Sequence, residues 1–262
     1  MTSRTAAVTP RTALVTGAAR GIGHDVARRL LAEGWRVVLT DVHADVALVA
    51  DALGGERALG LVADAASPAD AAAVVDAALG AFGRIDAFVA NAAVGGPETP
   101  LLDTPDAEIQ HVLDVNFFGV LHGVRAVRSA LARSDRPRIV VIGSLFAQQP
   151  TPGAGAYSAA KAAVGSLMRT LSVELAEEVP GLTVNAVAPG YVMTEMHREE
   201  LRSRARRTGR TFDEERARVV AQVPLGRHGT GADVADAVHH LLSGAAYVTG
   251  QTVNVNGGVL TS

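Results

Sequence analysis

Short runs of β-branched residues alternate along this chain with longer alanine-rich stretches, and the alternation restricts the folds open to it. Because the strand-like runs are apolar at nearly every position, they belong in a parallel sheet that helices cover on both faces. We predict an α/β fold with a doubly wound, mostly parallel, seven-stranded sheet, in which ligands bind at the carboxyl ends of the strands. The predicted strands are residues 12–16, 36–40, 58–63, 85–90, 138–143, 182–188 and 252–255, and the predicted helices are residues 21–33, 45–53, 68–82, 105–133, 155–178 and 231–243.

Length and composition favour one globular domain. The 262 residues contain no internal repeat or low-complexity linker, and α/β folds of this length commonly form a single unit. A formal charge of −3 does not indicate a protein that binds nucleic acid. The absence of cysteine excludes a disulfide framework, a thiol nucleophile and a cysteine-bound metal. The eight histidines show no paired ligand spacing, so we expect no metal site.

The start of the chain and its apolar runs bear on where the protein works. Residues 1–11 form a short polar leader without the apolar core of a signal peptide. No later run approaches the roughly 18 uninterrupted apolar residues that a membrane-spanning helix needs. We therefore expect a cytoplasmic protein that does not contact a membrane.

A glycine-rich turn lies between the first predicted strand and the first predicted helix. It reads Gly17-Ala-Ala-Arg20-Gly21-Ile22-Gly23, a G-x-x-x-G-x-G spacing. Glycines there permit a tight turn and a close approach of the backbone to a pyrophosphate at the helix amino terminus. Such a turn alone is a weak indication of a nucleotide site, but its position between strand and helix strengthens it. No Gly-Lys-Ser/Thr follows, which argues against a triphosphate-binding P-loop.

Acidic residues end the second and third predicted strands. Asp41 lies eighteen residues after Gly23, where a carboxylate can accept hydrogen bonds from both adenosine ribose hydroxyls and repel a 2′-phosphate. The alternative is an aspartate that caps the following helix. Asp64 could contact the edge of the adenine ring, and an equal alternative is that it caps the following helix. These positions predict NAD as the cofactor in preference to NADP.

Tyr157 and Lys161 are four residues apart in a predicted helix and therefore lie one turn apart on the same face. Lys161 is the only lysine, since 23 of the 24 basic residues are arginine. An ammonium about 5 Å from a phenol would favour the phenolate by roughly 3 kcal/mol, or about 2 pKa units. Tyr157 could then act as a general acid and base, and Ser144 could supply a hydroxyl to the same reacting oxygen. Taken alone, a Tyr-x-x-x-Lys pair is more often a surface pair on a helix.

Taken together, these motifs resemble the short-chain dehydrogenase/reductase family in order and spacing over about residues 11–260. The resemblance is carried by the glycine turn after Thr16, Asp41, Asn91-Ala92-Ala93, Asn116, Ser144, Tyr157-x-x-x-Lys161 and Pro189-Gly190. Two features depart from the family pattern. The turn at Asn91 reads Asn-Ala-Ala where the family more often has Asn-Ala-Gly, and a single Ser144 replaces the frequent Ser-Ser.

The resemblance implies one Rossmann-type oxidoreductase domain over residues 1–262 and a role for each motif. Tyr157 would be the acid/base, and Ser144 would orient the substrate oxygen. Lys161 would lower the pKa of Tyr157 and bind the nicotinamide ribose, while Asn116 would hold a water that links Lys161 to solvent. The predicted cofactor-binding residues are Gly17, Arg20, Gly21, Ile22, Gly23, Asp41, Asp64, Asn91, Tyr157, Lys161, Pro189, Gly190 and Thr194.

Residues of about 194–220 correspond to the region that forms a mobile lid over the substrate in the family. The part between His197 and Arg218 holds eight arginines and five acidic residues. A solvated helical pair of mixed charge explains such a stretch more readily than an anion clamp does. In the family, the helix that carries the tyrosine joins subunits, which implies a homodimer or homotetramer.

The sequence therefore predicts an NAD-dependent oxidoreductase that interconverts a secondary alcohol and a ketone in a small hydroxy or keto compound. The alternative enzyme is an NADPH-dependent 3-oxoacyl or polyketide-type ketoreductase, against which Asp41 argues. A non-catalytic nucleotide-binding sensor would keep the fold but would not need Ser144, Tyr157 and Lys161 together. A methyltransferase would share only the glycine turn.

Overall fold

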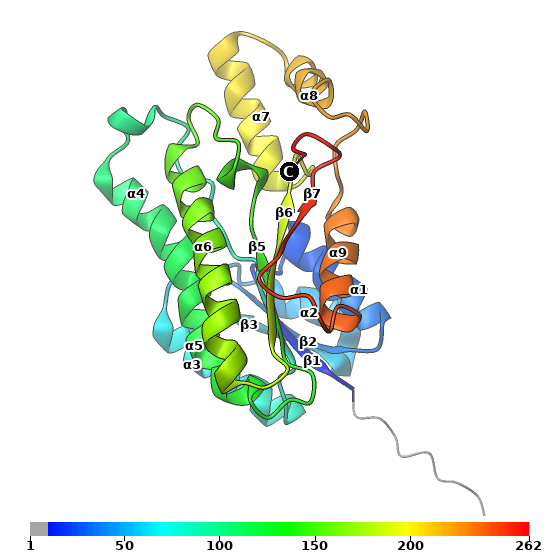
Figure 1. Cartoon of the computed structure of the whole chain (residues 1–262). Helices are drawn as coiled ribbons and strands as arrows, with labels where there is room; N and C mark the ends of the chain where they lie inside the picture. The colour runs from blue at the N-terminus through cyan, green and yellow to red at the C-terminus, as the bar shows by residue number, and fades with distance from the viewer. Residues whose placement is uncertain (1–9, 262) are drawn as a thin grey trace, which may run out of the picture.

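The computed structural model describes residues 10–261, which form a single seven-stranded sheet in which all paired strands are parallel (Figure 1). The strands are β1 (Thr12–Thr16), β2 (Arg36–Asp41), β3 (Ala58–Val62), β4 (Ala87–Ala90), β5 (Arg138–Ile142), β6 (Thr183–Pro189) and β7 (Thr252–Val255). Their order in the sheet, β3-β2-β1-β4-β5-β6-β7, confirms the predicted doubly wound fold. The strand order reverses between β1 and β4, and a crevice for ligands is expected at the carboxyl ends of these strands.

Helices cover both faces of the sheet. They are α1 (Gly21–Ala32), α2 (Val46–Gly54), α3 (Pro68–Phe82), α4 (Asp106–Leu113), α5 (Gly119–Leu131), α6 (Gly155–Glu178), α7 (Glu195–Thr208), α8 (Phe212–Val220) and α9 (Gly231–Ser243). One core cluster joins the sheet to α1, α2 and α9, and a second joins its other face to α3, α5 and α6 (Figure 1). The sheet is therefore the middle layer of three.

Successive residues of each central strand face opposite helical layers. In β1, Ala13 and Val15 belong to the core on the side of α1 and α9, whereas Leu14 belongs to the core on the side of α5 and α6. β5 alternates in the same way. Because both faces are buried, these strands have to be apolar at every position, which is why the sequence pattern located them.

The helical predictions need two corrections. The single helix predicted for residues 105–133 is interrupted by a π-helical turn, Asp114–Phe118, between α4 and α5. Residues 195–220, for which no helix boundaries were predicted, form α7 and α8, with Leu201 of α7 and Val219 of α8 completely buried. Thr194 begins α7 as its N-cap, accepting a hydrogen bond from the amide of His197 at 3.3 Å.

Three expectations concern the start of the chain, membranes and metal ions. Of the polar leader predicted for residues 1–11, residues 1–9 lie outside the described residues. Among residues 10–261, no helix has the length and apolar character needed to cross a membrane. The same residues contain no group of three or more His, Cys, Asp or Glu side chains placed to hold a metal ion.

Two helical glycines give a matched test of how α5 packs on β4. A Cβ at Gly123 of α5 would overlap the ring of Phe88, whereas a Cβ at Gly80 of α3 would meet nothing within 4 Å. We expect Gly123→Ala to lower the free energy of unfolding by about 1–3 kcal/mol through overpacking. Gly80→Ala should raise it by about 0.5–1 kcal/mol, because alanine favours helix. Urea unfolding measures both, and an equal stabilisation of both variants would contradict the described packing.

Candidate active site

A cavity of about 880 Å³ opens at the carboxyl ends of the strands and extends under α7. It brings together most of the predicted site residues, although they are spread over the chain from the glycine turn to α7. Those that line it are Gly17, Arg20, Gly21, Ile22, Asp41, Asp64, Asn91, Ser144, Tyr157, Lys161, Pro189, Gly190 and Thr194. Gly23 and Asn116 do not line it, and the contacts of these two residues show what they do instead.

The glycine turn is packed tightly against the loop that follows β4. Gly17 has φ +63°, and a Cβ there would come 2.8 Å from the Cα of Ala92. A Cβ at Gly23 would overlap the carbonyl oxygen of Gly17. The side-chain amide of Asn91 donates to the carbonyl oxygens of Thr16 and Gly17, both at 2.8 Å. Gly23 and Asn91 therefore hold the shape of the turn.

Asp41 and Asp64 are not the N-caps of the helices that follow them. The N-cap of α2 is Asp45, and the N-cap of α3 is Ser67. The Asp41 carboxylate is buried, and accepts hydrogen bonds from the amides of Ala19 at 3.0 Å and His43 at 3.1 Å. These contacts fix the carboxylate beside the glycine turn at the cavity wall. Asp64 is exposed and accepts from the amide of Ala66 at 2.9 Å.

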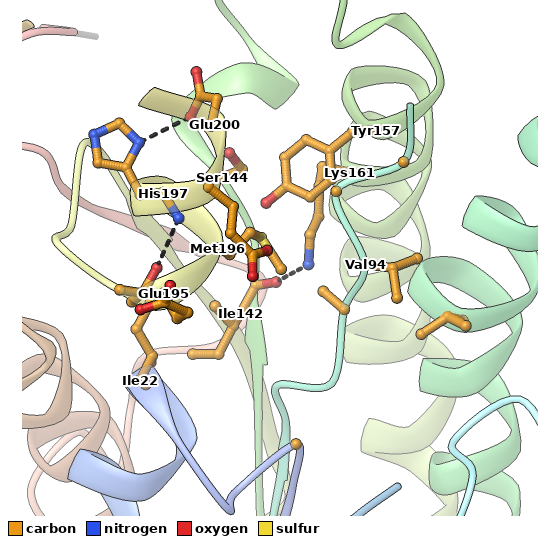
Figure 2. A pocket seen from close by; sticks show the side chains of 18 of the residues that line it. Ile22, Val94, Ile142, Ser144, Tyr157, Lys161, Glu195, Met196, His197 and Glu200 are labelled. Atoms are coloured by element: carbon orange, nitrogen blue, oxygen red, sulfur yellow. Dashed lines mark hydrogen bonds and ion pairs between the residues drawn. The ribbon is translucent and has the colours of Figure 1, made fainter. Parts of the chain in front are cut away.

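Lys161 extends from α6 to the end of β5 (Figure 2). Its ammonium group donates a hydrogen bond to the carbonyl oxygen of Ile142 at 2.8 Å, and the residue is only 3% exposed. Burial lowers the pKa of Lys161 to about 8, because the charged form loses solvation. At neutral pH the side chain is therefore still mostly an ammonium ion.

The predicted effect of Lys161 on Tyr157 does not appear in this structure. Burial raises the pKa of Tyr157 above its ordinary value, while a hydrogen bond with Ser144 lowers it and the charge of Glu200 raises it. The Lys161 ammonium lies 5.7 Å from the centre of the Tyr157 ring and binds Ile142 instead. Tyr157 is therefore a neutral phenol at neutral pH, and its hydroxyl faces Ser144 across the cavity (Figure 2).

Asn116 is fully buried in the π-helical turn, behind the cavity wall. Its side-chain oxygen accepts from the amide of Val94 at 2.8 Å, and its side-chain nitrogen donates to the carbonyl oxygen of Val94 at 2.9 Å. Both polar atoms of the side chain are thus used to hold the loop after β4. These bonds use one of the two donors and one of the two acceptor sites of the side chain, and the predicted link from Asn116 through a water to Lys161 stays a prediction.

Comparison with known proteins identifies the family. The family described as Enoyl-(Acyl carrier protein) reductase matches residues 17–260. The 3-oxoacyl-(acyl-carrier-protein) reductase FabG of Escherichia coli (strain K12) is 35% identical over 248 residues, 94% of this chain and 96% of that protein. The chain belongs to the short-chain dehydrogenase/reductase family.

Solved structures of similar proteins agree with this. The NAD+-bound xylitol dehydrogenase has a TM-score of 0.89 at 28% identity, covering 96% of this chain and 100% of that chain. The 3-ketoacyl-(acyl-carrier-protein) reductase from Brucella melitensis complexed with NADH has a TM-score of 0.85 at 29% identity, covering 95% and 98%. As a short-chain dehydrogenase/reductase, this protein is an oxidoreductase that acts on CH–OH groups with a nicotinamide cofactor.

Five of the eight arginines between His197 and Arg218 form ion pairs with carboxylates. The ion pairs are Arg202–Glu195, Arg204–Glu200, Arg207–Glu98, Arg210–Glu215 and Arg216–Asp213. The Arg207–Glu98 pair, at 2.7 Å, ties α7 to the loop after β4. This pairing agrees with the interpretation of a mixed-charge helical pair.

Sequence reasoning missed three cavity residues on α7. His197, Glu200 and Arg204 form a connected set, in which Glu200 accepts hydrogen bonds from both of the other side chains. Their i,i+3 and i,i+4 spacing was a usable signal for contact on one helix face. The sequence did not show that this face would turn toward Tyr157.

Tyr157→Phe tests the proton-transfer role that we assign to the phenol. Removing only the hydroxyl should lower turnover by at least ~10²-fold and leave the affinity for the nicotinamide cofactor nearly unchanged. Turnover is followed by nicotinamide absorbance, and cofactor affinity by fluorescence titration. Tyr247→Phe, which removes an exposed phenol, is the control and should behave like the parent. Unchanged activity in Tyr157→Phe would refute the assignment.

Proposed function

We propose that this protein is an NAD-dependent dehydrogenase that interconverts a secondary alcohol and a ketone in a small hydroxy or keto compound. The supporting observation is that one cavity has the buried carboxylate of Asp41 at one end and Ser144, Tyr157 and Lys161 at the other. A carboxylate at the first position suits the adenosine ribose of NAD, and the other three residues suit an alcohol or ketone oxygen.

The glycine turn fits a dinucleotide. Gly17 leaves no room for a Cβ, and the turn runs directly into the amino terminus of α1, which favours a bound anion. Gly17, Gly21 and Ile22 would hold the pyrophosphate, Asp41 the ribose and Asp64 the adenine. Pro189, Gly190 and Thr194 would hold the nicotinamide. The cofactor would accept or supply the hydride, while the chain binds, orients and transfers protons.

The reacting oxygen would be held by two hydroxyl groups. Ser144 accepts a hydrogen bond from the amide of Phe146 at 3.1 Å, and its own proton, which bonds to Tyr157 in this structure, would turn to a substrate oxygen. Tyr157 is protonated at neutral pH, because burial raises its pKa, and can therefore donate its proton to a ketone oxygen. Alcohol oxidation needs the phenolate, so it should become faster as pH rises. We assign Lys161 the role of supporting that phenolate and the nicotinamide ribose.

A 3-oxoacyl reductase is the second candidate, because FabG of Escherichia coli carries that name and is similar over 94% of this chain. Such an enzyme, if NADPH-dependent as in the alternative above, would need a group that receives a 2′-phosphate. Arg20 lines the cavity at the glycine turn and is the residue that could do so. Asp41 opposes it, since a carboxylate repels the phosphate.

Cofactor preference separates the two candidates. We expect NADH to bind on the order of 10²-fold more tightly than NADPH, because placing a phosphate against Asp41 should cost a few kcal/mol. Fluorescence titration of the free enzyme measures both affinities. Asp41→Asn should narrow the preference, and Arg20→Ala should widen it. Equal affinities in the parent protein would show that Arg20 outweighs Asp41 and would favour the second candidate.

We further propose that residues 194–220 form a lid and that the protein is a homodimer or homotetramer. The Arg207–Glu98 ion pair joins α7 to the loop after β4, and the Arg207 side chain is about half exposed. Exposed pairs of this kind contribute little stability, so they permit opening. On α6, Val173 is 72% exposed, and Phe118 at the start of α5 is 38% exposed. These apolar side chains suit a subunit interface.

A further inference from the structure

Glu200 extends from α7 into the cavity on the side opposite α6. Figure 2 shows Glu200 on the side of Ser144 away from Tyr157, with a hydrogen bond to His197, and all three of Ser144, Tyr157 and Glu200 line the cavity. The side chain is 22% exposed, and that of His197 is 8% exposed. A carboxylate is thus placed near the two hydroxyl groups to which we assign the reacting oxygen, and the proposed function gives it no task.

The carboxylate is held in a fixed position by two neighbours on the same helix. His197 Nδ1 lies 2.8 Å from one oxygen of Glu200, and Arg204 donates a hydrogen bond to the other oxygen. Burial raises the pKa of Glu200, but the bond to His197 and the charges of His197 and Arg204 outweigh it, so the net shift is downward. Glu200 is therefore ionised at neutral pH.

Glu200 still has capacity to bind a ligand. An ionised carboxylate can accept about four hydrogen bonds, and the two neighbours use one on each oxygen. Because the Arg204 guanidinium already compensates the charge of Glu200, a neutral donor is sufficient to complete the site. An anionic group beside Glu200 would be repelled by the carboxylate, whereas a neutral hydroxyl would not.

The wall between Tyr157 and Glu200 is aromatic. Phe146 meets the ring of Tyr157 edge to face at 6.3 Å between centroids, and the ring of Tyr191 at 6.0 Å. Tyr191 lies 5.7 Å from the ring of His197. A carbon chain can lie along these rings with one oxygen at Ser144 and Tyr157, while another polar group reaches Glu200.

We propose that Glu200 selects substrates that carry a second hydroxyl group, diols or polyols and the corresponding hydroxyketones, by accepting a hydrogen bond from that hydroxyl. The inference rests on the proposed function, because it takes Ser144 and Tyr157 as the site of the reacting oxygen. Glu200 would be a specificity residue that leaves the chemistry at the carbinol carbon unchanged.

The test compares a matched pair of alcohols, cyclohexanol and cyclohexanediol, with xylitol as an open-chain polyol. A hydrogen bond to a charged acceptor contributes about 1.5–3 kcal/mol, so the parent should favour the diol about 10- to 100-fold in kcat/KM. At the high-pH plateau of the rate profile, where Tyr157 is fully ionised in both proteins, Glu200→Gln should remove most of this preference and leave kcat/KM for cyclohexanol within about twofold. Asp213→Asn removes one negative charge from α8 outside the cavity lining and should keep the preference.

The pH profile provides a readout that a purely structural role would not move. The charge of Glu200 raises the pKa of Tyr157, so Glu200→Gln should shift the rise of alcohol oxidation to lower pH with cyclohexanol and the diol alike. If Glu200→Gln unfolds, Glu200→Asp retains the charge, shortens its reach, and should lose part of the diol preference.

Two negative results have different meanings. Equal rates for diol and cyclohexanol in the parent, or an equal loss for both in Glu200→Gln, would refute the role of Glu200 and leave the dehydrogenase assignment standing. Failure of the parent to oxidise any of the three alcohols, although it binds NADH, would refute the proposed function and with it this inference.

Discussion

The buried hydrogen bond between Lys161 and the carbonyl oxygen of Ile142 fixes the geometry on which the rest of the site depends. It joins α6 to the carboxyl end of β5. Ser144 lies two residues after that strand, and Tyr157 lies one helical turn before Lys161. One contact between a helix and a strand thus fixes the relative positions of three side chains. Arginine would be a poor substitute, because its wide planar group cannot act as a compact charge at this depth.

Two asparagines support the site from behind. Asn91 holds the glycine turn through the carbonyl oxygens of Thr16 and Gly17, and Asn116 holds Val94. The loop after β4 is therefore fixed at both ends by side-chain amides. This arrangement keeps the ends of β1 and β4 at a constant separation, which a dinucleotide lying across the crevice requires.

The strands and most helices could be predicted because their signals are local, as in β4, which is apolar at every residue, and β5, which is apolar after Arg138. The π-helical turn could not, since it coincides with pairing between Asn116 and Val94, which are 22 residues apart. The fourth strand was predicted to begin at residue 85, but β4 begins at Ala87. Asp86, just before it, is buried, and its carboxylate accepts a hydrogen bond from the amide of Thr12 at 2.8 Å, a contact between residues far apart in the sequence.

The site was predicted more completely in its residues than in its electrostatics. Motif spacing found Asp41, Ser144, Tyr157 and Lys161. The prediction of a lowered pKa for Tyr157 considered only the attraction of the Lys161 ammonium, but burial of Tyr157 raises its pKa in this structure, so the predicted direction was wrong.

Transfer of deuterium tests the account most directly. With cyclohexanediol deuterated at its carbinol carbons and NAD+, mass spectrometry should find deuterated NADH and hydroxyketone in equal amounts. Tight NADH binding without deuterium transfer from this diol, or from xylitol or cyclohexanol labelled in the same way, would contradict the account.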